Sequence, residues 1–145
     1  MVGILLITHN NLGDSLLDCV RHVIGNVPSQ LKSLSVFAED DPVAKEEEGR
    51  DLIKHLDTGD GVLILTDIYG ATPSNIAHRL CQPGHVEGVA GVNLPMLLRV
   101  SCGPDMPLQS MLFRALQGGK DCIMGLHADL PEINDCSCVV TAAEP

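Results

Sequence analysis

The hydrophobic positions of this chain follow two alternating patterns, short continuous runs and helical repeats. Residues 2–7 and 61–66 are aliphatic runs that end at polar residues, which is typical of strands buried on both faces. Residues 11–24 instead carry apolar side chains at helical spacing, and Gly25 then provides a stop. The same signals predict strands over 31–38 and 86–92 and helices over 42–56, 72–80, 95–101 and 108–117.

Strands that alternate with helices predict an α/β fold. We expect an open, doubly wound, mostly parallel sheet with helices on both faces. Residues 122–126 are the candidate for a C-terminal antiparallel edge strand. No internal linker or repeat interrupts the pattern, so we expect one domain over residues 1–127 and a tail over 128–145 without an assigned role. A sheet of this type binds ligands beyond the carboxyl ends of its strands.

The composition of the chain excludes some classes of partner for such a domain. The 145 residues include 9 Lys plus Arg against 19 Asp plus Glu, a formal charge of −10, and only 2% are aromatic. An acidic surface is unsuited to a phosphate backbone or an anionic membrane, and scarce aromatic rings offer no base-stacking platforms. The N-terminal apolar run has no basic segment before it and is far shorter than the ~20 residues of a membrane span. We therefore expect a cytoplasmic protein that binds no nucleic acid and does not insert into a membrane.

Polar side chains after two predicted strands are the candidates for chemistry. His9 follows the first strand, where an imidazole can act as nucleophile, general base, metal ligand or capping group. Asp67 ends a neighbouring strand, where its carboxylate would either fix the imidazole tautomer or serve as an ordinary turn acid. Thr72 precedes Pro73, so we expect it to cap the next helix and to offer a hydroxyl to an anion.

Taken together, these three residues favour a phosphoryl acceptor. A ring nitrogen of His9 is nucleophilic near neutral pH, and free amides at a helix N-terminus bind phosphoryl oxygens without a cationic side chain. The chain contains neither a G-x-G-x-x-G nor a P-loop pattern, and no second and third ligand accompany His9. We therefore expect no cofactor and no metal.

Three segments point to a family when they are read in order along the chain. They are Thr8-His9 after the first strand, LTDIYGATPSN at 65–75 and GVNLPMLL at 91–98. Over residues 1–126 the chain resembles the mannose-family (fructose/mannose-type) IIA component of the bacterial phosphoenolpyruvate:sugar phosphotransferase system (PTS). The resemblance implies a phosphotransferase in which the phosphohistidine form of the small carrier HPr phosphorylates Nε2 of His9. It also implies that Asp67 orients the imidazole and that Thr72 helps to bind the phosphoryl group.

The resemblance carries expectations about partners as well. Family members are often homodimers that exchange a C-terminal edge strand, for which 122–126 is the matching segment. No IIB domain follows in this sequence, so phosphate is expected to pass to a separate IIB-type acceptor or to serve as a signal to a regulatory protein. Three positions depart from the family pattern, because Asn10 and Ala71 stand where Gly is common and Tyr69 where Trp is common.

Two alternatives accompany this interpretation. The first is the related phosphotransferase subunit that serves dihydroxyacetone kinase, which shares the fold and a comparable histidine. We favour the sugar system because of the GVNLPMLL segment. The second is a non-enzymatic regulatory binding module whose partners sense whether His9 is phosphorylated.

Overall fold

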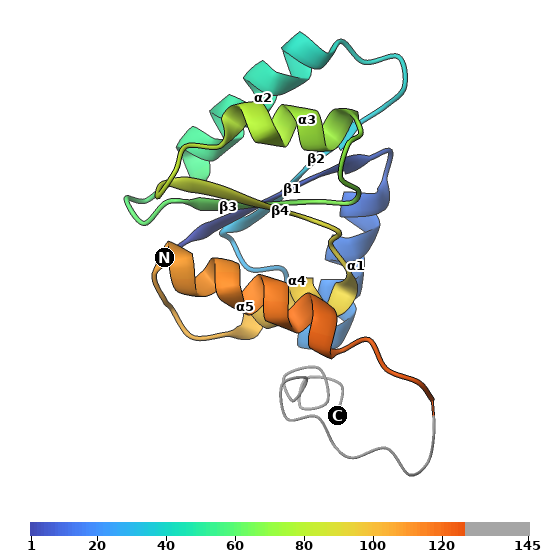
Figure 1. Ribbon diagram of the computed structural model, residues 1–145, viewed down its shortest axis with the longest axis vertical. Helices are drawn as coiled ribbons and strands as arrows, with labels where there is room; N and C mark the ends of the chain where they lie inside the picture. Colours follow the sequence, from blue (N-terminus) through green and yellow to red (C-terminus); the bar gives the residue numbers. More distant parts are fainter. Residues whose placement is uncertain (127–145) are drawn as a thin grey trace.

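The structure of the protein, a computed structural model, describes residues 1–126. Figure 1 shows its elements, which run β1 (Gly3–His9), α1 (Leu12–Ile24), β2 (Leu31–Val36), α2 (Pro42–Leu56), β3 (Val62–Thr66), α3 (Thr72–Leu80), β4 (Val86–Ala90), α4 (Leu94–Cys102) and α5 (Leu108–Asp121). This order of strands and helices confirms the predicted α/β class.

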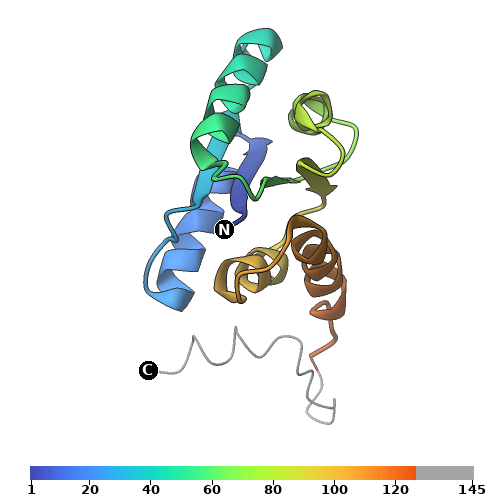
Figure 2. The ribbon, with the colours of Figure 1, turned by 90° about the vertical axis from the view of Figure 1, so that its left-hand side faces the viewer.

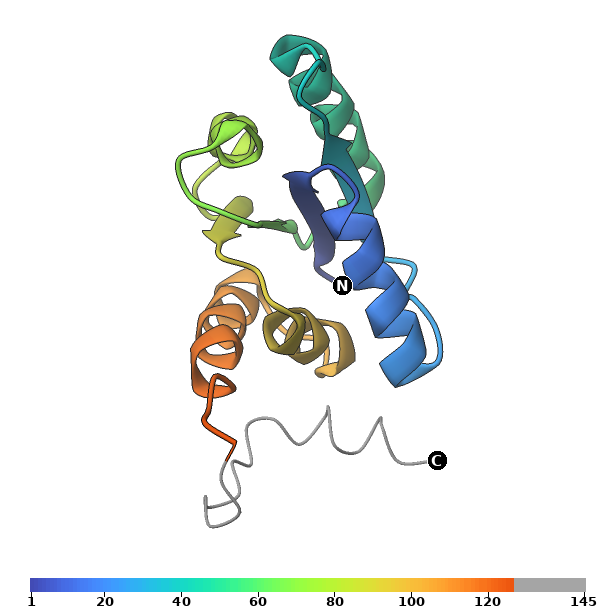
Figure 3. The same cartoon turned by 90° about the vertical axis from the view of Figure 1, so that its right-hand side faces the viewer.

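The four described strands form one parallel sheet in the order β2-β1-β3-β4. Helices α2 and α3 cover one face, whereas α1, α4 and α5 cover the other, as the two edge views in Figures 2 and 3 show. The chain moves from β1 to one side for β2 and then returns to the other side for β3. The strand order therefore reverses between β1 and β3, which is where a doubly wound sheet opens a crevice for ligands.

Each face of the sheet has its own aliphatic core, as the alternation along β3 illustrates. Leu63 and Leu65 belong to the cluster beneath α1, α4 and α5, while Val62 and Ile64 belong to the cluster beneath α2 and α3. All four side chains are fully buried, so β3 reads in the sequence as a continuous apolar run. Only where the strands leave these two cores can polar side chains follow them without a desolvation cost.

Helix α5 is longer than its predicted span, because it continues past residue 117 through two glycines. A Cβ atom at Gly118 would lie 2.7 Å from Cγ of Arg99, and one at Gly119 would lie 2.7 Å from Cε of Met96. Helix α4 therefore approaches α5 so closely that only glycine fits. Packing against α4 outweighs the low helix propensity of the two glycines.

The other boundaries agree with the prediction to within two residues, and hydrogen bonds explain the difference after β4. Gly91 adopts a φ of +92°, and the amides of Gly91 and Val92 both donate to the carbonyl of Thr66, at 3.0 and 2.9 Å. This turn ends β4 at Ala90 instead of residue 92. It also ties the start of the GVNLPMLL segment to the residue that precedes Asp67.

The expected edge strand over 122–126 is wrong for the single chain. Cys122 ends α5, and residues 123–126 form no strand in the structure, with Leu126 fully exposed. The sheet of the described chain thus has β2 and β4 as its edges. The expected tail over 128–145 lies outside the described residues. Within residues 1–126, no helix has both the length and the apolar character needed to cross a membrane.

Candidate functional site

The predicted pair of His9 and Asp67 meets where the strand order reverses. His9 is the last residue of β1, and Asp67 follows β3, the strand that pairs with β1. Nδ1 of His9 lies 2.8 Å from Oδ2 of Asp67. The sheet topology therefore brings together two side chains that are 58 residues apart in the sequence.

Three hydrogen bonds hold the Asp67 carboxylate in place. Besides the imidazole, the backbone amide of His9 donates to Oδ2 at 2.9 Å, and the amide of Ile68 donates to Oδ1 at 3.0 Å. Burial of Asp67 acts to raise its carboxyl pKa, but the hydrogen bonds and charge of His9 outweigh burial, and the pKa is lowered. The carboxylate is therefore ionised at neutral pH.

An ionised carboxylate only accepts hydrogen bonds, so it selects one tautomer of His9. Nδ1 must carry the proton that it shares with Asp67, which leaves the lone pair on Nε2. The imidazole side chain is 45% exposed, whereas Asp67 is only 11% exposed. The site thus holds a nucleophilic ring nitrogen that a large partner can approach, with its orienting acid kept inside.

Thr72 lies at the start of α3, but it is not the N-cap that the sequence predicts. The N-cap is Ala71, which offers no side-chain hydrogen bond, and Thr72 is the first helical residue, ahead of Pro73. Within residues 1–126, the Thr72 hydroxyl makes no direct hydrogen bond to His9 or Asp67. The amide of Asn75 is the first in α3 to donate four residues back, to the Ala71 carbonyl at 2.9 Å. The amides of Thr72 and Ser74 therefore lack intrahelical partners, and an anion can bind them.

The backbone at Asn10 explains one departure from the family pattern. Asn10 has a φ of 49°, and it is the one non-glycine residue in the described chain with a positive φ. Its amide donates to the carbonyl of Val36 at 3.0 Å, which fixes the exit from β1. Asn tolerates this left-handed conformation better than other side chains, so it can replace Gly directly after His9.

Two hydroxyl groups make contacts near the site that were not predicted from the sequence. Thr8 is buried, and its Oγ1 accepts from the amide of Gly13 at 2.8 Å, so a strand residue stabilises the first turn of α1. Ser74 Oγ accepts from the amide of Gly70 at 2.8 Å and donates to the carbonyl of Ala71 at 2.9 Å. Neither contact has a sequence signal, because neither residue stands at a recognisable cap position.

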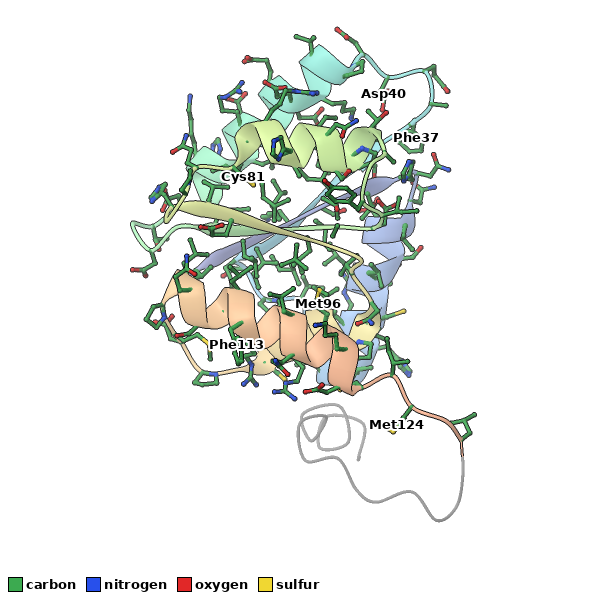
Figure 4. All side chains as sticks on the ribbon, viewed as in Figure 1. Phe37, Asp40, Cys81, Met96, Phe113 and Met124 are labelled. Carbon is green, nitrogen blue, oxygen red and sulfur yellow. The ribbon has the colours of Figure 1, made fainter. Side chains whose placement is uncertain are left out.

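Exposed apolar side chains follow the ends of the strands around this site. Phe37 lies on the loop after β2, near Asp40 in Figure 4, and is 39% exposed. Ile68 and Tyr69, directly after Asp67, are 56% and 87% exposed. Phe37 follows β2, and Ile68 and Tyr69 follow β3, so these side chains come after the two strands that flank β1 and His9. No three His, Cys, Asp or Glu side chains of residues 1–126 are grouped so that they could hold a metal ion.

The chain is similar in sequence and in fold to known proteins. Residues 3–110 match the family described as PTS system fructose IIA component. The mannose-specific EIIAB component of the PTS from Escherichia coli K12 is 29% identical over 130 residues, which cover 88% of this chain and 40% of that protein. The chain thus spans less than half the length of this curated relative.

Two solved structures share the fold. The PTS component EIIA from Streptococcus agalactiae has a TM-score of 0.77 at 18% identity, covering 86% of this chain and 97% of its own. The mannose/sorbose-specific IIA subunit from Enterococcus faecalis has a TM-score of 0.75 at 23% identity, covering 91% of this chain and 98% of its own. The agreement extends over nearly the whole length of both relatives.

Proposed function

This chain belongs to the PTS system fructose IIA component family, the mannose-type phosphoryl carriers of the sugar phosphotransferase system, and we propose that its phosphoryl acceptor is Nε2 of His9. The observation that carries the proposal is the 2.8 Å contact between Nδ1 of His9 and the Asp67 carboxylate. That contact leaves Nε2 with its lone pair on an imidazole that is half exposed. Asp67 orients the ring and does not itself react.

The proposed transfer moves one phosphoryl group between two imidazoles. The lone pair of His9 Nε2 attacks the phosphorus of a phosphohistidine on HPr. A new N–P bond forms while the donor N–P bond breaks, and the donor imidazole leaves with the electron pair of that bond. The proton on Nδ1 of His9 stays in place, so the ring becomes cationic, and the Asp67 carboxylate balances that charge.

The start of α3 supports the binding of the transferred group. The amides of Thr72 and Ser74 lack intrahelical partners, and the positive end of the helix dipole lies in the same turn. We propose that these amides and the exposed Thr72 hydroxyl bind phosphoryl oxygens. Such a site requires no basic side chain, which is compatible with a chain whose formal charge is −10.

The proposed partners are HPr as donor and a separate IIB-type component, or a regulatory protein, as acceptor. The exposed Phe37, Ile68 and Tyr69 support docking of another protein over the site. We propose that the protein acts in the cytoplasm as a homodimer, with residues 1–127 as the IIA domain. Sedimentation equilibrium tests the dimer, and a monomeric mass over the micromolar range would contradict it.

Phosphorylation from a reconstituted donor system tests the site. The chain is incubated with phosphoenolpyruvate, enzyme I and HPr, and intact mass spectrometry measures the addition of one acid-labile phosphoryl group. We expect the group on the wild type and on His22→Ala, which removes an exposed histidine of α1 as a matched control. We expect none on His9→Ala. An unmodified wild type, or a phosphorylated His9→Ala variant, would contradict the proposal.

The destination of the phosphate separates the proposed role from its two alternatives. Phosphorylated protein is mixed with a IIB component in one reaction and with a dihydroxyacetone kinase subunit holding ADP in another. Transfer to IIB supports the sugar system, whereas transfer to ADP alone would assign the chain to the kinase. Transfer to neither, together with a partner that binds only one phosphorylation state, would favour a regulatory module.

A further inference from the structure

Ser74 closes the loop between the end of β3 and α3. Its Oγ accepts a hydrogen bond from the amide of Gly70 at 2.8 Å and donates one to the carbonyl of Ala71 at 2.9 Å. The Ser74 hydroxyl thus accepts a hydrogen bond from one loop residue and donates one to the next. The Ala71 carbonyl also accepts the first backbone hydrogen bond of α3, from Asn75.

Packing contributes little to the conformation of this loop. Ile68 and Tyr69 are 56% and 87% exposed, and Gly70 has a φ of +88° with nothing within 4 Å of the position that a Cβ would occupy. The loop is held at one end by the bond from the Ile68 amide to Asp67 Oδ1. At its other end, the bonds of Ser74 hold it.

We propose that Ser74 is a positioning residue for phosphoryl transfer, because its hydroxyl fixes the Gly70–Ala71 turn and so aims the free first-turn amides of α3 at the phosphoryl group. This inference rests on the proposed function, in which those amides bind the transferred group. Ser74 acts through the loop and does not touch the reacting atoms. Ser74 lies between Pro73 and Asn75, within the LTDIYGATPSN segment, and neither the sequence pattern nor the resemblance assigns it a role.

The surroundings of Ser74 allow a conservative test. Ser74 lines a cavity of about 110 Å³ between α3 and β4, together with Ala77, Cys81 and Gly88. A threonine at this position keeps the hydroxyl, and the cavity has room for the additional methyl group. Ser74→Ala removes both hydrogen bonds, whereas Ser74→Thr retains them, so the pair isolates the hydroxyl from the volume of the side chain.

The experiment measures phosphoryl transfer from phosphorylated HPr by rapid-quench kinetics for the wild type, Ser74→Ala and Ser74→Thr. Loss of one or two hydrogen bonds of ordinary strength corresponds to a fall of about threefold to tenfold in the transfer rate constant of Ser74→Ala. We expect the rate constant to change more than the KM for HPr, because the substitution replaces no docking side chain, although Ile68 and Tyr69 lie on the loop that it loosens. Ser74→Thr should restore the rate. The matched control is Ser101→Ala, which removes a helical serine bonded to the Leu97 carbonyl in α4.

A second measurement tests the contact itself without reference to transfer. Amide hydrogen exchange at Gly70, followed by NMR, should be faster in Ser74→Ala and unchanged in Ser74→Thr. Wild-type transfer rates in Ser74→Ala, or a slow Ser74→Ala whose Gly70 exchange is unaltered, would overturn the inference. If the wild type accepts no phosphate, the proposed function fails instead, and the exchange data still decide whether Ser74 closes the loop.

Discussion

The starts of α3 and α4 look alike in the sequence and differ in the structure. Each follows a parallel strand, and each has a proline in its first turn. At α4, Oδ1 of Asn93 accepts from the amide of Met96 at 2.9 Å, and Nδ2 donates to the carbonyl of Gly119 at 2.9 Å. At α3, the N-cap is Ala71, and no side chain caps the helix. One helix end is closed by its own residue and bonded to α5, whereas the other has no side-chain cap.

The residues at the two N-cap positions account for the difference, because Ala71 has no side-chain acceptor whereas Asn93 has an amide oxygen. Asn93 turns forward onto its own helix and bonds within it. Asp67 turns back instead, toward the imidazole and the backbone amide of His9 on the neighbouring strand. A side-chain cap occupies one of the free amides of the first turn, so an uncapped helix end offers an additional donor to an anion.

The largest expected effect is that of Asp67→Asn, which removes the carboxylate that turns away from α3. An amide no longer selects the Nδ1-protonated tautomer or balances the cationic ring, so we expect phosphorylation of His9 to slow by about 10- to 100-fold, as activity does when metal-bound histidines lose their orienting partner. Rapid-quench transfer from phosphorylated HPr measures the rate. An unchanged rate would show that Asp67 is an ordinary turn acid.

The same substitution predicts a change in acid stability. The folded-state pKa of Asp67 lies below its ordinary value, so the ionised carboxylate stabilises the fold above the unfolded-state pKa, about 3.9. That contribution is lost as the pH falls through the folded-state pKa. Urea unfolding of Asp67→Asn should therefore depend less steeply on pH below about 4 than unfolding of the wild type. Parallel pH profiles of the two proteins would falsify this assignment.

Removing the side-chain cap of α4 should affect the free energy of unfolding more than the rate of phosphoryl transfer. Asn93→Ala removes the bonds to Met96 and Gly119, and we expect the free energy of unfolding to fall by about 2 kcal/mol. Urea unfolding measures the loss, with Asn93→Asp as the control that keeps the cap to Met96. Phosphorylation of the folded variant should proceed at the wild-type rate. A fall in the phosphorylation rate that the loss of folded protein does not account for would mean that α4 takes part in the site.

Adding a side-chain cap to α3 should have the opposite effects. Ala71 has the extended backbone of an N-cap residue, at φ −107° and ψ 174°, so Ala71→Asp can cap α3 without strain. We expect stability to rise by about 1 kcal/mol and phosphorylation to slow by about tenfold, because the cap occupies amides and its charge repels a phosphoryl group. Ala71→Asn separates the two causes, since it caps the helix without the charge. A stabilised Ala71→Asp variant with full transfer activity would mean that the α3 amides do not bind phosphate.

The smallest effect is expected at Asn10, where the chain turns from His9 toward α1. Asn10→Gly should change the free energy of unfolding by only a few tenths of a kcal/mol, because both residues accept a left-handed backbone. Asn10→Val should cost more than about 1 kcal/mol, since a β-branched side chain is strained at a φ of 49°. Thermal unfolding compares the two variants. Equal stabilities would mean that the backbone at Asn10 relaxes without cost.

Local patterns predicted the elements of this fold well where burial is complete. The run at 61–66 reads as a strand because helices cover β3 on both faces, α3 on one and α5 on the other, and His9 and Asp67 are recognisable because each follows such a run. The prediction was wrong where contacts between distant segments decide at which residue a helix begins or ends. Helix α5 continues through Gly118 and Gly119 because α4 lies against them, and Thr72 is not the cap because the loop places Ala71 there.

The sequence by itself therefore determined the α/β class, the strands that end at the site, and the two residues on which the proposed chemistry depends. Hydrophobic periodicity and residue type are local properties, and they can be read without coordinates. The structure bore out the expectation that β1 and β3 are neighbours and placed Nδ1 of His9 2.8 Å from Asp67, and it alone decided that Ala71 is the N-cap of α3 and that Ser74 closes the loop before it. Those outcomes depend on strand pairing and on hydrogen bonds of defined distance and angle, which no spacing along the chain encodes.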